Sequence, residues 1–353
     1  MAFLSIPNVA IRGIAACVPP KIQENRDIPF YTREEAEKVI ATTGVERRHV
    51  VSDGITASDL CLKACEKLTE ELGWEAESID LICNVTQTSD YINHPNVFVL
   101  HEKLGLKQNC MALDLFHGCP GWVMGMSTVA SLMSHGTLRR GIMLDGDCIT
   151  RTCYAYDRES VPLFGDCGTA TAFEYAEEAA SMLFHTGTIS ADGMALAREI
   201  GGHRNPFTVE TFIKDQDKLS GKAEPTADDH LMDGMSVFSF GITVPPKSIK
   251  QLCEHYGKNM EEVDKVILHQ GNLFMVNKIA KKLKVAKDKV PSCLGEYGNT
   301  TSTSIPLTIV SQCRKEYEEE ALKTIACGYG TGLSWGTVYL ETSHIKCPEV
   351  IIY

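Results

Sequence analysis

The chain has 353 residues, of which 44% are hydrophobic, so it can bury a large core or two domains of ordinary size. Its 46 acidic and 34 basic residues give a formal net charge of −12, which argues against general binding to nucleic acids or anionic membranes. The 14 cysteines form no C-x-x-C pair and no zinc-like spacing, so we expect neither a metal site nor a thiol-redox motif.

Predicted strands and helices alternate through the first half of the chain. Residues 1–7 lack the basic start of a signal peptide and are interpreted as a first strand, and a buried strand is predicted over 9–18. Thr32 begins a T-x-x-E capping pattern, so a helix is predicted from there to Gly44. Further helices are predicted over 57–72 and 95–104, and further strands over 79–87, 111–116, 141–146 and 168–174. This alternation is typical of the α/β class.

The segment His117–Gly121 lies between an apolar strand over 111–116, which we predict to be buried, and a nearly uncharged helix predicted over 122–133. Pro120 suits the first turn of that helix, so Cys119 is expected at its N-terminus, where free N–H groups and the helix dipole favour a thiolate. A nucleophilic cysteine is one interpretation. The alternative is a structural cysteine, because free cysteine is among the most buried residue types.

Two features bear on the location of the protein. The segment from Leu115 to Leu138 contains no Asp, Glu, Lys or Arg and is long enough to mimic a membrane span. Its Pro, Gly and His residues cluster at the expected strand and helix boundaries, so we interpret it as buried core and predict no membrane association. Many thiols without a secretion signal favour a reducing compartment, so we expect a cytoplasmic protein.

An internal similarity indicates a duplicated fold. Residues 73–80 and 257–264 both follow the pattern G-x3-E-x-[IV]-D, and each is followed by an apolar strand. The same offset carries Cys119 onto Thr303, which also precedes an apolar run. We therefore predict two similar halves, residues 1–175 and 176–353, each with one strand–helix site. The polar residues 203–233 lack periodicity and are interpreted as a surface insertion that could cover a substrate entrance.

The second half contains three polar or glycine-rich segments. A predicted strand over 265–269 ends in His269-Gln-Gly-Asn272, and a later loop contains Gly298-Asn299. Taken singly, a histidine at a strand end and an asparagine in a loop are usually surface or capping residues. The glycine-rich segment 326–336 lacks the spacing of a phosphate loop, and its glycines would instead allow the backbone to approach a reacting centre.

Together these segments resemble the β-ketoacyl-acyl carrier protein synthase III family of the thiolase superfamily. The resemblance covers essentially all 353 residues. It rests on TGVERRH (43–49), the turn around Cys119, FGDCGTA (164–170), HLMDGMSVF (230–238), HQGN (269–272), GNTT (298–301) and the glycine-rich end (328–336).

The resemblance implies a thiolase-like fold of five layers, α/β/α/β/α, with two similar halves and mixed sheets. It implies an acyltransferase in which Cys119 is acylated by a primer thioester, while His269 and Asn299 stabilise the enolate formed when malonyl-acyl carrier protein loses carbon dioxide. The tetrahedral oxyanion would be held by the backbone N–H groups of Cys119 and Thr331. Coenzyme A or carrier thioesters are the substrates, no cofactor is expected, and members are generally homodimers.

A basic helical face suggests where the carrier protein binds. Lys278, Lys281 and Lys282 are spaced i, i+3 and i+4, so they share one face of a helix that follows His269. The alternative is that these lysines are exposed to solvent and bind no partner. On an acidic protein, however, it would complement an acidic acyl carrier protein.

Several residues depart from the family pattern. Lys38 and Thr42 stand where well-studied members have Trp and Arg contacting coenzyme A, and Phe274 replaces an Arg that commonly follows the HQAN motif. His94 replaces an aromatic residue that shapes the acyl pocket. With Asn272, His94 and Phe274 are our substrate-binding candidates. The departures weaken the case for acetyl-coenzyme A and favour a carrier-borne or unusual primer.

Two alternative functions stay open at this point. One is another cysteine-dependent acyl transfer or hydrolysis of a thioester, against which the presence of both His269 and Asn299 argues. The other is a non-catalytic partner subunit of a condensing enzyme, although such subunits typically lack the nucleophile that Cys119 would supply.

Overall fold

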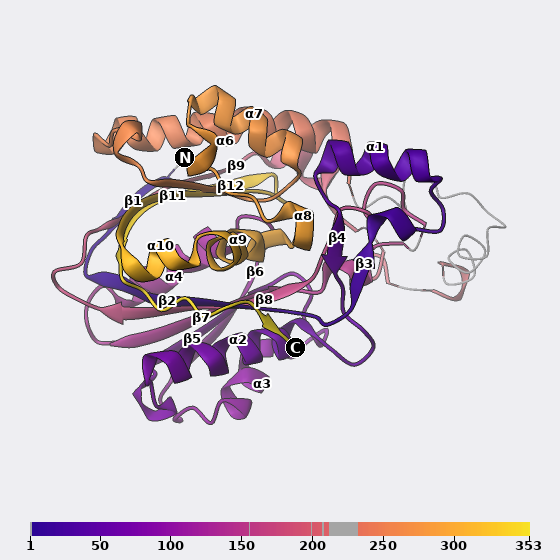
Figure 1. The fold of residues 1–353 in the computed structure, drawn as a ribbon. Coiled ribbons are helices and arrows are strands. Elements are labelled where there is room, and N and C mark those ends of the chain that lie inside the picture. Colours follow the sequence, from indigo (N-terminus) through magenta and orange to yellow (C-terminus); the bar gives the residue numbers. More distant parts are fainter. Residues whose placement is uncertain (1, 155, 199, 207, 212–231) are drawn as a thin grey trace.

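The computed structural model describes residues 2–154, 156–198, 200–206, 208–211 and 232–353. Two β-sheets lie face to face, with helices between them and on both outer sides (Figure 1). The layers therefore follow the order α/β/α/β/α. The five-layered α/β architecture expected from the family resemblance is confirmed.

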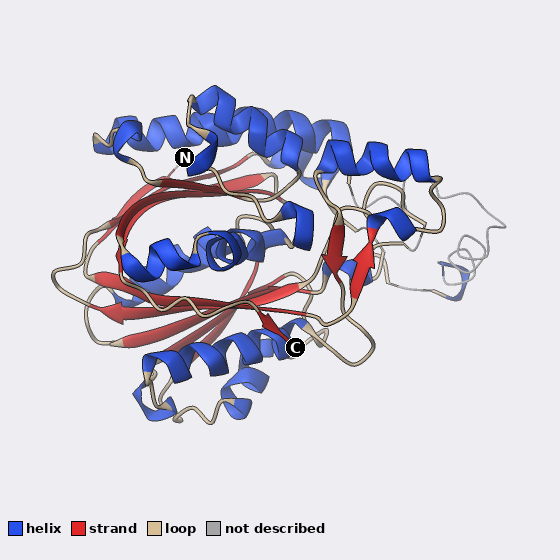
Figure 2. Ribbon diagram, in the orientation of Figure 1, coloured by secondary structure: helices blue, strands red, loops and turns tan. Residues whose placement is uncertain are grey.

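The first sheet has six strands and is mixed. The strand order is β13 (Ile351–Ile352), β2 (Val9–Val18), β8 (Cys167–Tyr175), β7 (Arg140–Asp147), β5 (Leu81–Thr86) and β6 (Met111–Phe116). Three neighbouring pairs, β5–β6, β5–β7 and β13–β2, are parallel, and the two pairs that β8 forms with β2 and β7 are antiparallel. Helices α2 (Ala57–Leu72) and α3 (Asn96–Lys103) cover the outer face of this sheet (Figure 2).

The second sheet has five strands, of which only the last pair is parallel. Helices α6 (Gly234–Tyr256) and α7 (Leu273–Leu283) lie over its outer face. The strand order is β1 (Ala2–Ile6), β9 (Met182–Thr188), β12 (Ser334–Ser343), β11 (Ala321–Gly330) and β10 (Lys265–Leu268).

The middle layer holds α4 (Gly121–Met133), α9 (Ser304–Gln312) and the short α10 (Arg314–Glu319). Side chains of α4 such as Trp122 and Met126 are fully buried, because this helix contacts strands of both sheets. A helix enclosed in this way has no solvent face, so its sequence is apolar all round. This explains the charge-free run around α4. Among the described residues, no helix is long and apolar enough to cross a membrane.

Helix α1 (Arg33–Thr43) lies beside the layers, next to the antiparallel pair of β3 (Ile22–Glu24) and β4 (Arg47–His49). The predicted capping is confirmed: Thr32 and Glu35 form a reciprocal capping box, and Gly44 ends the helix in the left-handed conformation with φ +77°. A Cβ on Gly44 would lie 2.5 Å from the Cβ of Leu273, so this glycine lets α1 pack against the start of α7.

One sequence expectation about burial is wrong. Strand β6, expected to be buried, forms an edge of the first sheet and has β5 as its one neighbour in the described chain. Met111 and Phe116, its end residues, are 44% and 79% exposed. An open edge with exposed apolar side chains is a surface that proteins normally cover.

The repeated sequence occupies equivalent positions in the two sheets. Gly73 ends α2 and Gly257 ends α6, both with φ +63°. Each is followed by a 3-10 turn and then by Asp80 or Asp264, which immediately precedes β5 or β10. Both carboxylates accept a backbone N–H from the neighbouring strand, at 3.3 Å from Arg140 for Asp80 and at 2.8 Å from Lys323 for Asp264. The repeat therefore encodes the turn from an outer helix into a sheet.

The two sheets do not follow the halves of the sequence strictly. The N-terminal strand β1 belongs to the second sheet and the C-terminal strand β13 to the first. The division at residue 175 stays a prediction. Of the polar insertion over 203–233, residues 207 and 212–231 lie outside the described residues, as do the first two residues of the HLMDGMSVF segment.

Candidate active site

Cys119, His269 and Asn299 line one cavity of about 450 Å3. Cys119 comes from the turn before α4, His269 follows β10, and Asn299 lies in the loop that leads toward α9. Equivalent strand–helix junctions of the two sheets thus meet at one place. Most of the other lining is apolar: Leu163, Phe164, Leu196, Met232, Met235, Val237, Phe238, Met275 and Tyr329.

Cys119 is 5% exposed and lies two residues before the first residue of α4, with Pro120 as the N-cap. Two polar groups of Thr331, its backbone N–H and its hydroxyl, act to lower the pKa of the Cys119 thiol. Burial nevertheless raises the pKa of the Cys119 thiol, and the charge of Asp147 adds to this effect. Desolvation outweighs the polar groups of Thr331, so the raised pKa favours the thiol form of Cys119 over the thiolate expected from the sequence.

His269 is 3% exposed, and burial lowers its pKa to about 4. Its Nδ1 lies 3.0 Å from the carbonyl oxygen of Thr301 and 2.8 Å from the hydroxyl oxygen of Ser304. Because a carbonyl can only accept, Nδ1 carries the proton and Nε2 holds a lone pair. At neutral pH the site thus contains a thiol and a neutral imidazole rather than an ion pair.

Asn299 is 5% exposed, and its amide has a fixed orientation. Its Oδ1 accepts the N–H of Thr301 at 3.0 Å, and its Nδ2 donates to the carbonyl oxygen of Gly271 at 3.5 Å. One Nδ2 hydrogen is therefore left to donate to a ligand in the cavity. Thr301 holds both polar residues, because its carbonyl binds His269 and its N–H binds Asn299.

The other predicted substrate-binding residues are placed differently. Asn272 lines the cavity, but its Oδ1 caps α7 by accepting the N–H of Met275 at 2.8 Å. Phe274 is 44% exposed on α7, outside the described lining, with its ring 5.7 Å from that of Phe238. His94 is exposed and likewise outside the lining. Its loop leads into α3, whose first N–H groups bond Asp114 of β6.

The three predicted docking lysines are all exposed on α7. Lys278 Nζ lies 4.9 Å from the centre of the Phe274 ring. Lys282 has a structural partner, since its Nζ donates to the carbonyl oxygen of Ile242 at 2.8 Å. That carbonyl in α6 is left free because Pro246 has no N–H to bond it.

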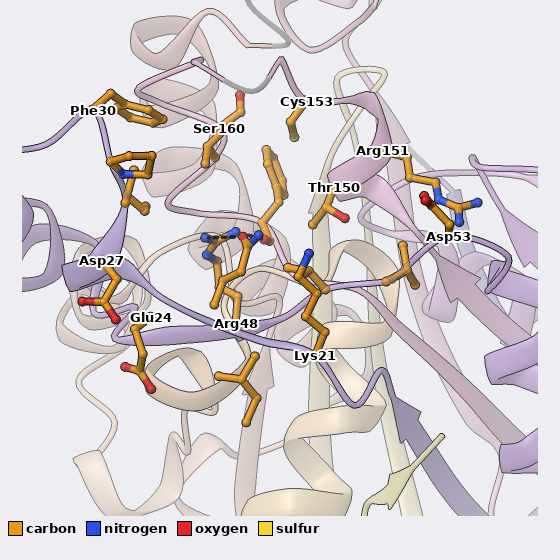
Figure 3. Close-up of a pocket in the computed structure, with 18 residues that line it drawn as sticks. Lys21, Glu24, Asp27, Phe30, Arg48, Asp53, Thr150, Arg151, Cys153 and Ser160 are labelled. Carbon is orange, nitrogen blue, oxygen red and sulfur yellow. Dashed lines mark hydrogen bonds between the residues drawn. The ribbon is translucent and has the colours of Figure 1, made fainter.

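A larger cavity of about 650 Å3 lies between the β3–β4 strand pair and residues 150–164 (Figure 3). Its lining carries both charges, including Lys21, Glu24 and Asp27 (Figure 3). At its floor the 2% exposed Arg48 donates to neutral oxygens, among them the carbonyl of Phe164. Within the described parts of the chain, Phe164 is the one residue that lines both cavities. Arg48 thus supports the segment that separates the two.

The sequence reasoning missed several residues behind the site. Thr301 belongs to the GNTT segment, but its part in holding His269 and Asn299 depends on its left-handed backbone, with φ +57°, which no pattern indicates. Asp147 ends β7 and is fully buried. Asp145 and Asp147 are the acidic residues of the otherwise apolar run 141–147, and this pattern could have indicated a buried carboxylate.

The chain is similar in sequence to known 3-oxoacyl-[acyl-carrier-protein] synthases. The sequence model of 3-oxoacyl-[acyl-carrier-protein] synthase III matches residues 113–193, and that of its C-terminal part matches residues 253–342. A β-ketoacyl-[acyl-carrier-protein] synthase III from Streptococcus sanguinis is 30% identical over 334 residues, covering 93% of this chain and 97% of the relative.

Solved structures agree with the sequence comparisons. The crystal structure of a 3-oxoacyl-(acyl-carrier protein) synthase from Burkholderia xenovorans superposes with a TM-score of 0.92 and 31% identity, covering 100% of this chain and 99% of the other. A second structure, of a 3-oxoacyl-(acyl-carrier-protein) synthase III, gives a TM-score of 0.87 with 28% identity over 95% of this chain and 99% of the other.

Proposed function

Because the chain belongs to the 3-oxoacyl-(acyl-carrier-protein) synthase III family, we propose that it is an acyltransferase that condenses an acyl thioester with malonyl-acyl carrier protein. The products are a β-ketoacyl thioester and carbon dioxide, as in the initiation of fatty-acid biosynthesis or a related pathway. The observation that carries this proposal is the meeting of Cys119, His269 and Asn299 in one mostly apolar cavity.

In the first step Cys119 attacks the carbonyl carbon of the primer thioester. His269 Nε2 has a free lone pair and takes the thiol proton, so the sulfur attacks as a thiolate only at the moment of reaction. The primer thiolate takes this proton from His269 Nε2 and leaves as a thiol. Cys119 is now acylated, and His269 is neutral again.

In the second step malonyl-acyl carrier protein occupies the same cavity. The negative malonyl carboxylate favours protonation of His269, whose Nε2 takes a proton from water. The thioester oxygen then accepts hydrogen bonds from Asn299 Nδ2 and from His269 Nε2. These donors stabilise the enolate as the carboxylate leaves as carbon dioxide, because negative charge develops on the oxygen they bind. The apolar lining favours this step, since loss of carbon dioxide turns a localised carboxylate into an uncharged gas and a delocalised enolate.

In the third step the enolate carbon attacks the carbonyl carbon of acyl-Cys119. The tetrahedral oxyanion is bound by the backbone N–H groups of Cys119 and Thr331, and one such donor typically contributes about 10²–10³ in rate. Collapse of the intermediate expels the Cys119 thiolate, which recovers its proton from His269 Nε2. Protons and charges therefore balance, and the cycle uses no cofactor.

The acyl carrier protein would dock on the exposed face of α7 through Lys278 and Lys281, with Lys282 partly occupied by its bond to α6. Helix α7 begins one residue after Asn272, which lies in the cavity wall. Phe274 presents an aromatic surface beside the cavity rather than a cation for a nucleotide phosphate. A carrier-borne or unusual primer therefore fits better than acetyl-coenzyme A.

A homodimer would cover the open edge of β6. Two copies related by a twofold axis can pair this strand with itself and bury Met111 and Phe116 in one continuous sheet. His94 lies on the loop before α3, whose first N–H groups bond Asp114 of β6, so it lies near the same edge. A role for His94 at the acyl group would thus require the second copy. A cytoplasmic location, suggested by 14 free thiols, is part of the same proposal.

Two variants test the division of roles. With an acyl-coenzyme A primer and malonyl-acyl carrier protein, Cys119→Ala should make no β-ketoacyl product but still release carbon dioxide from the malonyl thioester. His269→Ala should lose that release. Formation of the β-ketoacyl product by Cys119→Ala would overturn the proposal.

A further inference from the structure

We propose that Asp147 is a positioning residue that fixes the two parts of the active site relative to each other. It holds the His269–Asn299 pair through Thr301, and it holds the turn before Cys119 through Gln87. The inference rests on the proposed function, because it assigns to Asp147 a part in both acylation and decarboxylation. Asp147 itself touches neither substrate nor the reacting atoms.

Asp147 is fully buried at the end of β7 and accepts five hydrogen bonds. Its Oδ1 accepts the hydroxyls of Thr86 and Thr88, each at 3.1 Å, and the N–H of Gln87 at 2.9 Å. Its Oδ2 accepts Gln87 Nε2 at 3.1 Å and the Thr301 hydroxyl at 2.5 Å. Among the described residues no basic side chain forms a salt bridge with it. Burial raises the pKa of this carboxyl, and its hydrogen bonds act against that rise. Because amide N–H groups can only donate, the donor set fits an ionised carboxylate.

The first link runs through Thr301. This residue is 1% exposed, with φ +57°, and is the one β-branched residue of the described chain in the left-handed region. Such a backbone persists only when its surroundings hold it there. The hydroxyl bond to Asp147 is the side-chain contact that does so. The same backbone orients His269 through its carbonyl and Asn299 through its N–H.

The second link runs through Gln87. Both its backbone N–H and its side-chain Nε2 bond Asp147, which fixes the direction of its Oε1. A Cβ on Gly118 would lie 2.8 Å from that Oε1 and 2.7 Å from the Thr331 hydroxyl oxygen. Gln87 and Thr331 therefore enclose the backbone of the turn that presents Cys119. Release of Gln87 would leave this side of the turn without support.

Asp147 therefore joins the strand–helix junctions of the two sheets. It belongs to β7 of the first sheet, whereas Thr301 begins the 3-10 turn that leads into α9 and orients His269 at the end of β10 in the second sheet. Its negative charge also opposes ionisation of Cys119, which keeps the nucleophile as a thiol until His269 removes the proton.

Two readouts separate positioning from mere structural support. The first is carbon dioxide release from malonyl-acyl carrier protein, which reports His269 and Asn299. The second is the pH profile of Cys119 alkylation by iodoacetamide, which reports the thiol without any acyl substrate. Asp147→Asn should lower carbon dioxide release about 10²-fold, because Thr301 loses its partner. It should also shift the pH profile of Cys119 alkylation to lower pH, because a nearby negative charge is lost.

Thr301→Val, which keeps the shape and loses the hydroxyl, should lower carbon dioxide release about 10²-fold and leave the alkylation profile in place. Thr301→Ser, which restores the hydroxyl, should recover most of the release. Asp80→Asn is the matched control, because Asp80 also accepts backbone N–H groups at a strand end but lies away from the cavity. It should change neither readout.

The inference is overturned if Thr301→Val and Thr301→Ser release carbon dioxide equally, or if folded Asp147→Asn matches the wild type in both readouts. Should Asp147→Asn fail to fold, the two Thr301 variants decide the matter. If the wild type itself releases no carbon dioxide from malonyl-acyl carrier protein, the proposed function fails, and the shift of the alkylation profile still tests the link to Cys119.

Discussion

Gly330→Ala should disable the nucleophile and spare the decarboxylation pair. A Cβ at this position would lie 2.6 Å from the sulfur and 2.7 Å from the Cβ of Cys119. Ordinary contact between such atoms requires about 3.5–4.0 Å, so the Cys119 side chain or the β11 backbone must shift by about 1 Å. A misplacement of this size costs about 10²-fold in rate, equivalent to about 2.7 kcal/mol in the barrier to acylation.

The assay is the rate of acylation of Cys119 by an acyl-coenzyme A that the wild type accepts, followed by intact-protein mass spectrometry. Carbon dioxide release from malonyl-acyl carrier protein is measured beside it and should stay within about threefold, because neither His269 nor Asn299 is among the nearest neighbours of the added methyl group. Gly295→Ala is the control, since the nearest atom to its new Cβ is 3.8 Å away. Acylation of Gly330→Ala at the wild-type rate would refute the proposed contact between this backbone and the nucleophile.

Four further changes have defined outcomes. Thr331→Val keeps the backbone N–H and should lower condensation by less than about tenfold, whereas a larger loss would assign the oxyanion contact to the hydroxyl. The unfolded chain binds a proton at His269 at a pH where the folded chain does not, so stability should fall by about 2 kcal/mol from pH 7 to pH 5. Urea unfolding at both pH values should show a smaller fall in His269→Gln, and an equal fall would contradict the buried neutral state. Phe116→Asp should shift sedimentation from dimer to monomer, and a wild-type monomer would remove the proposed interface. Lys278→Glu with Lys281→Glu should raise KM for malonyl-acyl carrier protein with little change in kcat, and an unchanged KM would place docking elsewhere.

Much of the architecture was predictable because the signals are local. The capping box at Thr32 and the left-handed Gly44 fixed α1, and the charge-free run after Pro120 identified a helix enclosed on all sides. The repeated G-x3-E-x-[IV]-D pattern was informative for a physical reason, since its aspartate bonds the neighbouring strand in both sheets.

Other features could not be predicted because they depend on contacts between distant segments. The apolar sequence of β6 is the same for a buried strand and for an edge, and only the strand order distinguishes them. The pKa of Cys119 depends on a balance between burial and the donors of Thr331, which follows β11. Thr301 orients His269 and Asn299 through its backbone, and no local sequence pattern predicts that its carbonyl oxygen contacts His269.

The most direct test of the account follows one acyl group through the site. The wild-type protein is loaded from a panel of acyl-coenzyme A and acyl-carrier thioesters, the adduct is mapped by mass spectrometry, and malonyl-acyl carrier protein is then added. The account predicts an acyl group on Cys119 that disappears as the matching β-ketoacyl-carrier product and carbon dioxide form in equal amounts. Release of that acyl group as a free acid, or an adduct on another residue, would contradict it.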